Sequence, residues 1–224
     1  MTQNYLLALL SAFILWLGWP PIPYSSVLLL IGFVPLLVAV ENIIRGEYRH
    51  KGRKIFWTAF LTGFVWNTAS IYWVFNAMNA QLPAWISLLI AMIPFGLAPL
   101  LMATAFRLYY AMRRTQNIWV SFIGLVSFWI CYEYVHQTWD LAFPWMTLGN
   151  GFANFHQIIQ WYSVTGVYGG TLWIWIVNIL AFMLYWQYKP QVQAYSQKVL
   201  LSIPLAAAFV PILISVIQYI SYEE

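Results

Sequence analysis

Long apolar runs, each of about 20 residues, recur along the chain and are separated by short polar segments. A helix of that length spans the hydrocarbon core of a bilayer. The runs that fit well are 25–44, 56–76, 85–106, 161–185 and 199–220, and 118–137 makes a further one. Residues 5–19 form a shorter candidate, followed directly by a proline-rich turn. We therefore expect an all-α integral membrane protein: one domain over residues 1–224, a bundle of about seven transmembrane helices.

The composition leaves no material for a water-exposed catalytic domain. Hydrophobic residues make up 62% of the chain and charged residues 7%, which is typical of integral membrane proteins. The net charge of +4 comes from short basic clusters between apolar runs, a pattern of loops beside an anionic leaflet and not of a nucleic-acid-binding surface. The lone Cys131 lies inside an apolar run and allows neither an intrachain disulfide nor a cysteine-rich metal site.

The basic residues also predict how the bundle is oriented. All ten Lys and Arg residues lie in alternate connections, at 45–54, 107–114 and 189–198. Because lysine and arginine are enriched in cytoplasmic loops, we expect the N-terminus inside and Glu223-Glu224, after seven crossings, outside. Residues 1–4 contain no Lys or Arg and no small-residue cleavage motif follows, so the first apolar run is expected to remain as a membrane segment.

Glu133 and His136 are the polar residues that an apolar helix is least expected to carry. They lie three residues apart near the far end of the run 118–137, so they share a helix face and can touch. One interpretation is structural: Glu133 pairs with His136, or with the amide of Asn67 or Asn76, and locks two helices together. The other is a proton relay or a contact with lipid headgroups. The sequence leaves both open.

The connection 138–160 is the longest one without basic residues, and it is rich in aromatic side chains. Pro144 fixes its own φ and biases Phe143 toward an extended conformation, which gives the segment Phe143-Pro144-Trp145 a defined shape. Such a loop is either an interfacial aromatic belt or a shaped lipid-binding site. Gly149-Asn150-Gly151 predicts a turn.

Two glycines predict helix packing, and the sequence lacks several catalytic motifs. Gly166 and Gly170 lie four residues apart in an apolar run and predict a face on which another helix packs closely. The sequence has no HExxH motif, no glycine-rich phosphate loop and no GxSxG elbow. We expect no metal site, no cofactor and no complete catalytic apparatus in this chain.

Three stretches together resemble one known family. "CYEYVHQTWDLAFPWMTLGN" followed by "YSVTGVYGGTLWIWIVN" is similar to the part of bacterial apolipoprotein N-acyltransferases in which a helix with a Glu, and an Arg three residues on, runs into Gly-Phe-Pro-Trp and then a glycine-containing helix. "TGFVWNTASIYWVF" resembles the third helix of that family, and the turn from Trp19 to Tyr24 fits as well. The resemblance runs along essentially the whole chain.

This sequence departs from the family pattern at two positions in the same stretch. His136 stands where the family usually has Arg, and Ala142 where it usually has Gly. Because histidine is not charged at all times, a headgroup-anchoring role of that arginine does not transfer directly to His136.

The resemblance implies a function and a missing part. Family members continue into a nitrilase-like domain outside the membrane, whose Glu-Lys-Cys triad takes an acyl chain from a phospholipid and passes it to the N-terminal amine of a diacylglyceryl lipoprotein. This chain ends at Glu224, where that domain would begin. We therefore expect an inner-membrane domain, multi-pass, that binds phospholipid and lipoprotein precursor, positions a nitrilase-like domain in cis or in trans, and is inactive alone.

The resemblance also suggests roles for particular residues. Glu133 would brace its helix so that Phe143, Pro144 and Trp145 form a rigid aromatic floor at the outer membrane interface. Tyr72 and Trp73, in the aromatic end of the third helix, are further candidates for contact with lipid or substrate.

Two other functions remain as alternatives. The chain could be a small transporter or channel subunit that uses Glu133 and His136 as a proton or substrate site. It could also be a non-catalytic assembly protein that holds partners through its glycine-faced helices.

Overall fold

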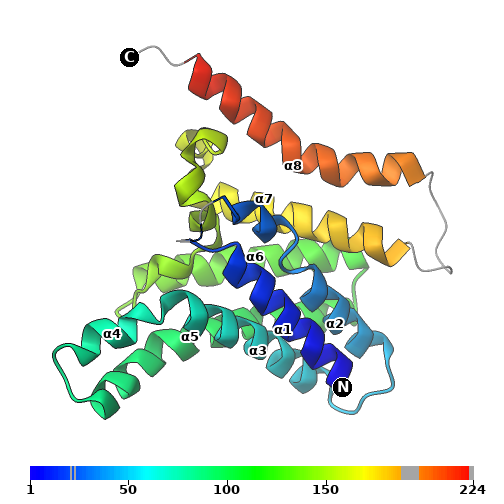
Figure 1. Ribbon diagram of the computed structural model, residues 1–224. Coiled ribbons are helices and arrows are strands. Elements are labelled where there is room, and N and C mark those ends of the chain that lie inside the picture. The colour runs from blue at the N-terminus through cyan, green and yellow to red at the C-terminus, as the bar shows by residue number, and fades with distance from the viewer. Residues whose placement is uncertain (21, 23, 188–196, 222–224) are drawn as a thin grey trace.

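The computed structural model describes residues 1–20, 22, 24–187 and 197–221, and over these residues the fold is entirely helical (Figure 1). Pro21 and Pro23 of the predicted turn lie outside the described residues, as do Lys189 and Glu223-Glu224, which entered the orientation argument.

The helices follow one another with short connections. In chain order they are α1 (Thr2–Leu17), η1 (Ser26–Leu30), α2 (Val34–Arg45), α3 (Lys51–Ile71), α4 (Trp73–Asn79), α5 (Ala84–Arg113), α6 (Ile118–Thr138), η2 (Pro144–Met146), η3 (Leu148–Ile158), α7 (Tyr162–Gln187) and α8 (Gln197–Ile220).

Five segments among the described residues are long and apolar enough to cross a membrane: Ser26–Arg45, Ala84–Arg113, Ile118–Thr138, Tyr162–Trp186 and Ser202–Ile220. They correspond to five of the predicted spans. The shorter apolar helix Thr2–Leu17 covers the first candidate. The chain therefore has several membrane-spanning helices, whereas the count of seven crossings and the side that each end faces stay predictions.

The predicted span 56–76 is not among these five, and its boundaries differ from the prediction. α3 begins five residues earlier, at Lys51, and is interrupted at Tyr72, after which α4 continues. Charged residues in its first turn lower the hydropathy of α3, and so do four polar residues that are buried: Thr58, Thr62, Asn67 and Ser70. The Thr62 hydroxyl, for example, donates to the carbonyl of Ala8 at 3.0 Å. α3 is thus a protein-facing helix packed between α1 and α5.

The two ends of the bundle differ in chemistry. At one end the Glu41 carboxylate accepts hydrogen bonds from Arg45 at 2.8 Å and Arg113 at 3.2 Å, and the Arg45 guanidinium lies 4.8 Å from the Trp186 ring centre. The ends of α2, α5 and α7 therefore meet, and we call this the basic end. The far ends of α1 and α3 meet the η2–η3 segment at the opposite end, near Trp19, which we call the aromatic end (Figure 1).

An aromatic cluster forms the centre of the core. Phe33 stacks on Trp175 with ring centroids 4.5 Å apart and meets the edges of Trp129 at 5.1 Å and Trp66 at 6.0 Å. The three tryptophans come from α3, α6 and α7, Phe33 directly precedes α2, and all four rings are buried. Asn178 of α7 fixes the same junction, because its side chain accepts from the Phe33 amide and donates to the Leu29 carbonyl, both at 2.8 Å.

α8 lies along α7 at the edge of the bundle, and most of its side chains are exposed (Figure 1). Pro211 in this helix has no N–H, so the carbonyl of Ala207, four residues earlier, lacks its helical partner. The indole N–H of Trp173 donates to that carbonyl at 2.8 Å. A side chain of α7 thus satisfies the backbone group that the proline leaves free, as membrane interiors require.

Gly166 and Gly170 lie near the start of α7, and the close helix packing expected at them stays a prediction. Gly166 has φ +65° and interrupts the helix, and a Cβ there would meet nothing within 4 Å. A Cβ at Gly170 would collide with the hydroxyl of Tyr162 in the same helix. Only glycine adopts the backbone conformation of Gly166 without strain. These two residues therefore shape the start of α7.

Candidate functional site

A hydrogen-bond network centres on Glu133, whose side chain is 2% exposed. One carboxylate oxygen accepts from the indole N–H of Trp129 at 2.9 Å and from the amide of Leu148 at 2.8 Å. The other accepts from the hydroxyl of Thr171 at 2.8 Å. Glu133 therefore joins α6, η3 and α7. Its partners are not those expected, because no hydrogen bond among the described residues links it to His136, Asn67 or Asn76.

The start of η3 explains why these donors converge. The first amides of a helix have no partner within it. Leu148 is the first residue of η3 and donates to Glu133, while the next amide, that of Gly149, donates to the Thr171 hydroxyl at 3.0 Å. The carboxylate and the hydroxyl thus cap η3 together. The predicted turn at Gly149–Gly151 is instead the first turn of this 3-10 helix.

A second layer of hydrogen bonds fixes the segment on both sides of Trp145. The Gln137 amide donates to the hydroxyl of Thr147 at 2.9 Å, and that hydroxyl donates to the carbonyl of Pro144 at 3.0 Å. The hydroxyl of Tyr168 donates to the Gln137 oxygen at 2.8 Å. Residues 144–147 are therefore tied to α6 and α7 through side chains, although the segment is not part of either helix.

A pocket of about 570 Å³ opens beside this braced segment at the aromatic end. Three of its aromatic side chains are largely exposed: Tyr72 at 61%, Trp73 at 41% and Trp145 at 60%. The Trp73 and Trp145 rings meet edge to face with centroids 5.5 Å apart. The remaining lining residues are Trp19, Pro20, Ser70, Ile71, Asn150 and Ala153.

The structure brings together three of the five predicted lipid-contact residues. Tyr72 and Trp73 come from the α3–α4 junction and Trp145 from η2, and all three line the pocket. Phe143 and Pro144 do not. Phe143 packs against the core, and the Pro144 carbonyl accepts hydrogen bonds from Thr147 and, at 3.3 Å, from the Asn150 side chain. These two residues shape the pocket from behind.

The family described as "Apolipoprotein N-acyltransferase N-terminal domain" matches residues 11–180, which contain the Glu133 network and the aromatic pocket. The chain belongs to the apolipoprotein N-acyltransferase family.

Two curated relatives agree with this assignment. The apolipoprotein N-acyltransferase of Chlorobaculum tepidum is 24% identical over 190 residues, 83% of this chain and 32% of the relative. The apolipoprotein N-acyltransferase of Geobacter metallireducens is 31% identical over 193 residues, 81% of this chain and 33% of the relative. The chain spans about a third of the length of these relatives. The resemblance seen in the sequence is thus confirmed for the N-terminal domain of the N-acyltransferases.

The other two predicted polar residues of this N-acyltransferase domain bond to groups other than Glu133. His136 is 4% exposed, and its Nδ1 accepts from the Trp139 indole at 3.1 Å. Asn67 is buried and donates to the Gly63 carbonyl of its own helix at 2.9 Å. Because three donors already occupy the Glu133 carboxylate, the geometry gives no support to a Glu133–His136 relay of a transporter.

Sequence reasoning missed Thr171, which connects Glu133 to η3. A signal was present: Thr171 and Asn178 lie seven residues apart, so they share one face of the otherwise apolar α7. Both are fully buried and both bond to other elements. Trp19 and Pro20 were noted only as part of a turn.

Over the described residues, no group of three or more His, Cys, Asp or Glu side chains is arranged to hold a metal ion.

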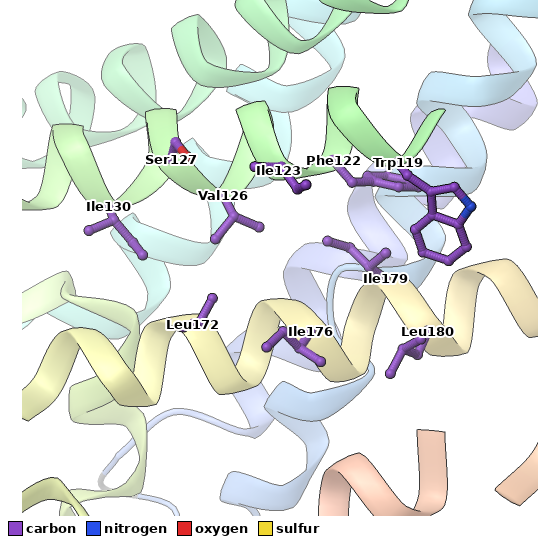
Figure 2. Close-up of a pocket in the computed structure, with 10 residues that line it drawn as sticks. All are labelled: Trp119, Phe122, Ile123, Val126, Ser127, Ile130, Leu172, Ile176, Ile179 and Leu180. Atoms are coloured by element: carbon purple, nitrogen blue, oxygen red, sulfur yellow. The ribbon is translucent and has the colours of Figure 1, made fainter. Parts of the chain in front are cut away.

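A second cavity, of about 410 Å³, lies between α6 and α7 (Figure 2). Trp119, Ile123 and Ile130 from α6 face Leu172 and Ile176 from α7, and the polar side-chain atoms of the lining belong to Ser127 and to the Trp119 indole. This groove suits hydrocarbon but offers little with which to recognise a headgroup or a peptide. The aromatic pocket, which has polar and aromatic groups together, is therefore the better candidate site of the N-acyltransferase domain.

Proposed function

We propose that this chain is the membrane domain with which an apolipoprotein N-acyltransferase of the bacterial inner membrane binds its phospholipid acyl donor and its diacylglyceryl lipoprotein acceptor. The observation that carries the proposal is the aromatic pocket, in which Tyr72, Trp73 and Trp145 are exposed beside a backbone fixed by the Glu133 network. The pocket lies at the end of the bundle away from Glu41 and its arginines, which corresponds to the periplasmic face if basic loops stay in the cytoplasm.

Each part of the site has a physical task in this scheme. Tryptophan and tyrosine favour the boundary between hydrocarbon and headgroups, since their bodies are apolar and their tips are polar. Lipid chains would lie against Trp73 and Trp145 with the glycerol region at the rim. Because the Pro144–Thr147 segment is already ordered, little conformational entropy is lost when a ligand binds.

The acyl-transfer chemistry itself would come from a nitrilase-like domain in cis or in trans. Its Glu-Lys-Cys triad would sit above the pocket, and the membrane domain would hold both substrates within reach. Cys131, the free cysteine of this chain, is exposed on α6 within a membrane-spanning helix and takes no part in the scheme.

Replacing Trp145 with alanine tests the proposal. The chain would be joined to, or expressed with, a nitrilase-like domain, and N-acylation of a diacylglyceryl lipoprotein would be measured at several phospholipid concentrations. Loss of an aromatic contact of about 1.5 kcal/mol predicts a drop in kcat/KM of about tenfold.

Trp85→Ala is the matched control, because Trp85 is 66% exposed at the start of α5 and does not line the pocket. It should leave acylation within about twofold of the parent chain. Acylation by Trp145→Ala at the parent rate, or an equal loss in both variants, would count against the pocket as the binding site.

A further inference from the structure

A third cavity lies far from the aromatic pocket, where the α2–α3 connection meets the start of α1. Its volume is about 420 Å³. Arg49, Arg53 and Lys54 supply positive charge to its lining and Glu47 one negative charge; the others are Tyr5, Tyr48, His50 and Trp57. Cations are therefore in excess in a concave site, and aromatic rings surround them.

The arginines of this cavity differ from those elsewhere at the basic end. Arg45 and Arg113 both bind the buried Glu41 carboxylate. Arg49 and Arg53 form no ion pair with any described residue, and both are exposed. Lys54 lies over the ring of Tyr48 at 5.8 Å instead of pairing with an acid. The charge that lines this cavity is thus available to an external anion.

The backbone around the cavity is held in place. Lys51 donates to the carbonyl of Ile44 at 2.7 Å and so ties the start of α3 to the end of α2. His50 has φ +54°, and its carbonyl accepts from the amides of Arg53 and Lys54 at 3.0 and 3.1 Å. The sharp turn therefore sets Arg49, before it, near the cationic side chains of the first turn of α3.

The aromatic residues indicate the depth of the site. Trp57 is 47% exposed and Tyr5 is 38% exposed, and each lies within the first two turns of its helix. Exposed tryptophan and tyrosine at helix ends mark the level of the headgroups. A ligand held here by arginine would thus have its charge at the membrane surface and its apolar part beside Trp57.

From these observations we infer that the cavity between Tyr5 and the Glu47–Trp57 segment binds the phosphate of an anionic phospholipid at the basic end of the bundle. Arg49 and Arg53 recognise the phosphate oxygens, and Lys54 adds a point charge. The site is independent of the aromatic pocket and of acyl transfer.

The test is native mass spectrometry of the whole chain in detergent, titrated with phosphatidylglycerol, phosphatidylcholine or inorganic phosphate. Arg53→Gln should weaken phosphatidylglycerol binding about fivefold, the factor expected for one interfacial cation. Arg114→Gln is the matched control, since it removes one exposed charge near the same end but outside the cavity, and it should change binding less than twofold. Arg53→Lys keeps the charge and should retain more of the binding than Arg53→Gln, and an unchanged SDS unfolding midpoint of Arg53→Gln would exclude misfolding as the cause of its loss.

The ligand series separates the sources of phosphate. Preference for phosphatidylglycerol over phosphatidylcholine, with no competition by millimolar inorganic phosphate, supports the lipid. Full competition by inorganic phosphate assigns the same cations to a soluble phosphate and overturns the lipid assignment. Equal losses in Arg53→Gln and Arg114→Gln would show that only the overall charge matters, and would overturn the site.

Discussion

Glu41 and Glu133 are almost equally buried, with 1% and 2% of their surfaces exposed, and they lie toward opposite ends of the bundle. Glu41, at the basic end, is held by two cations, Arg45 and Arg113. Glu133, beside the aromatic pocket, is held by an indole, a backbone amide and a hydroxyl, all of them neutral.

The different partners of Glu41 and Glu133 indicate that the two buried carboxylates have different structural roles. The arginines of Glu41 compensate its charge, but its second oxygen has no hydrogen-bond partner among the described residues. Both oxygens of Glu133 are occupied, and each donor approaches from a different element. Ion pairing tolerates a range of geometries, whereas several hydrogen bonds to one group fix directions. Glu41 thus fastens helix ends, and Glu133 orients a loop.

The largest effect is expected for Glu133→Ala. It leaves the Trp129, Leu148 and Thr171 donors buried without an acceptor, so the free energy of unfolding should fall by about 4 kcal/mol. Unfolding in a titration of detergent with SDS would measure it. Asp140→Ala, at an exposed acid beyond the end of α6, is the control and should change stability by less than about 0.5 kcal/mol. If Glu133→Ala lowered the free energy of unfolding as little as the control does, the hydrogen-bond network would not contribute to stability.

Neutral amides test whether charge or hydrogen bonding holds each acid. Glu41→Gln leaves two cations without their anion and should cost about 3 kcal/mol in the same titration. Glu133→Gln keeps the oxygen that serves Trp129 and Leu148 and loses mainly the Thr171 bond, so it should cost about 1 kcal/mol. Equal costs would remove the distinction between the two acids.

An effect as small as that of Glu133→Gln is expected for a partner of Glu133. Thr171→Val keeps the shape of the side chain but removes a donor to Glu133 and an acceptor for Gly149, and should cost about 1 kcal/mol. Hydrogen exchange at the Gly149 amide should accelerate as well. Thr104→Val is the control, because its exposed hydroxyl bonds, among the described residues, only to the Leu100 carbonyl of its own helix. If both valine variants behave alike, Thr171 does not cap η3.

Much of the helical framework could be predicted from hydropathy. The expected runs 118–137 and 161–185 differ from α6 and α7 by two residues or fewer at each end. The break at Tyr72 could not be predicted, because no glycine or proline marks it and both sides of it are helical. Glu41 went unnoticed inside an apolar run, although Arg45, four residues later, is the usual signal of a helical ion pair.

Some residues of the site could be predicted from the sequence, but their hydrogen bonds could not. Clustered aromatics and the family resemblance placed Trp145 and Tyr72 among the contacts, and the structure brings both to one pocket. The partners of Glu133 depend on how residues 148–158 fold back as a 3-10 helix, which no local pattern specifies. The positive φ of Gly166 could not be predicted either, because a glycine in a sequence is compatible with a close helix contact and with a positive φ.

The bond from Trp173 to the Ala207 carbonyl bears on how the chain is inserted into the membrane during synthesis. Pro211 leaves that carbonyl without an internal partner, and an unsatisfied carbonyl in hydrocarbon costs several kcal/mol. α7 precedes α8 in the sequence, so the indole donor is synthesised before the acceptor. The order of translation therefore supplies α8 with the partner it requires, and a permuted chain that made α8 first would have to insert it with that carbonyl unpaired.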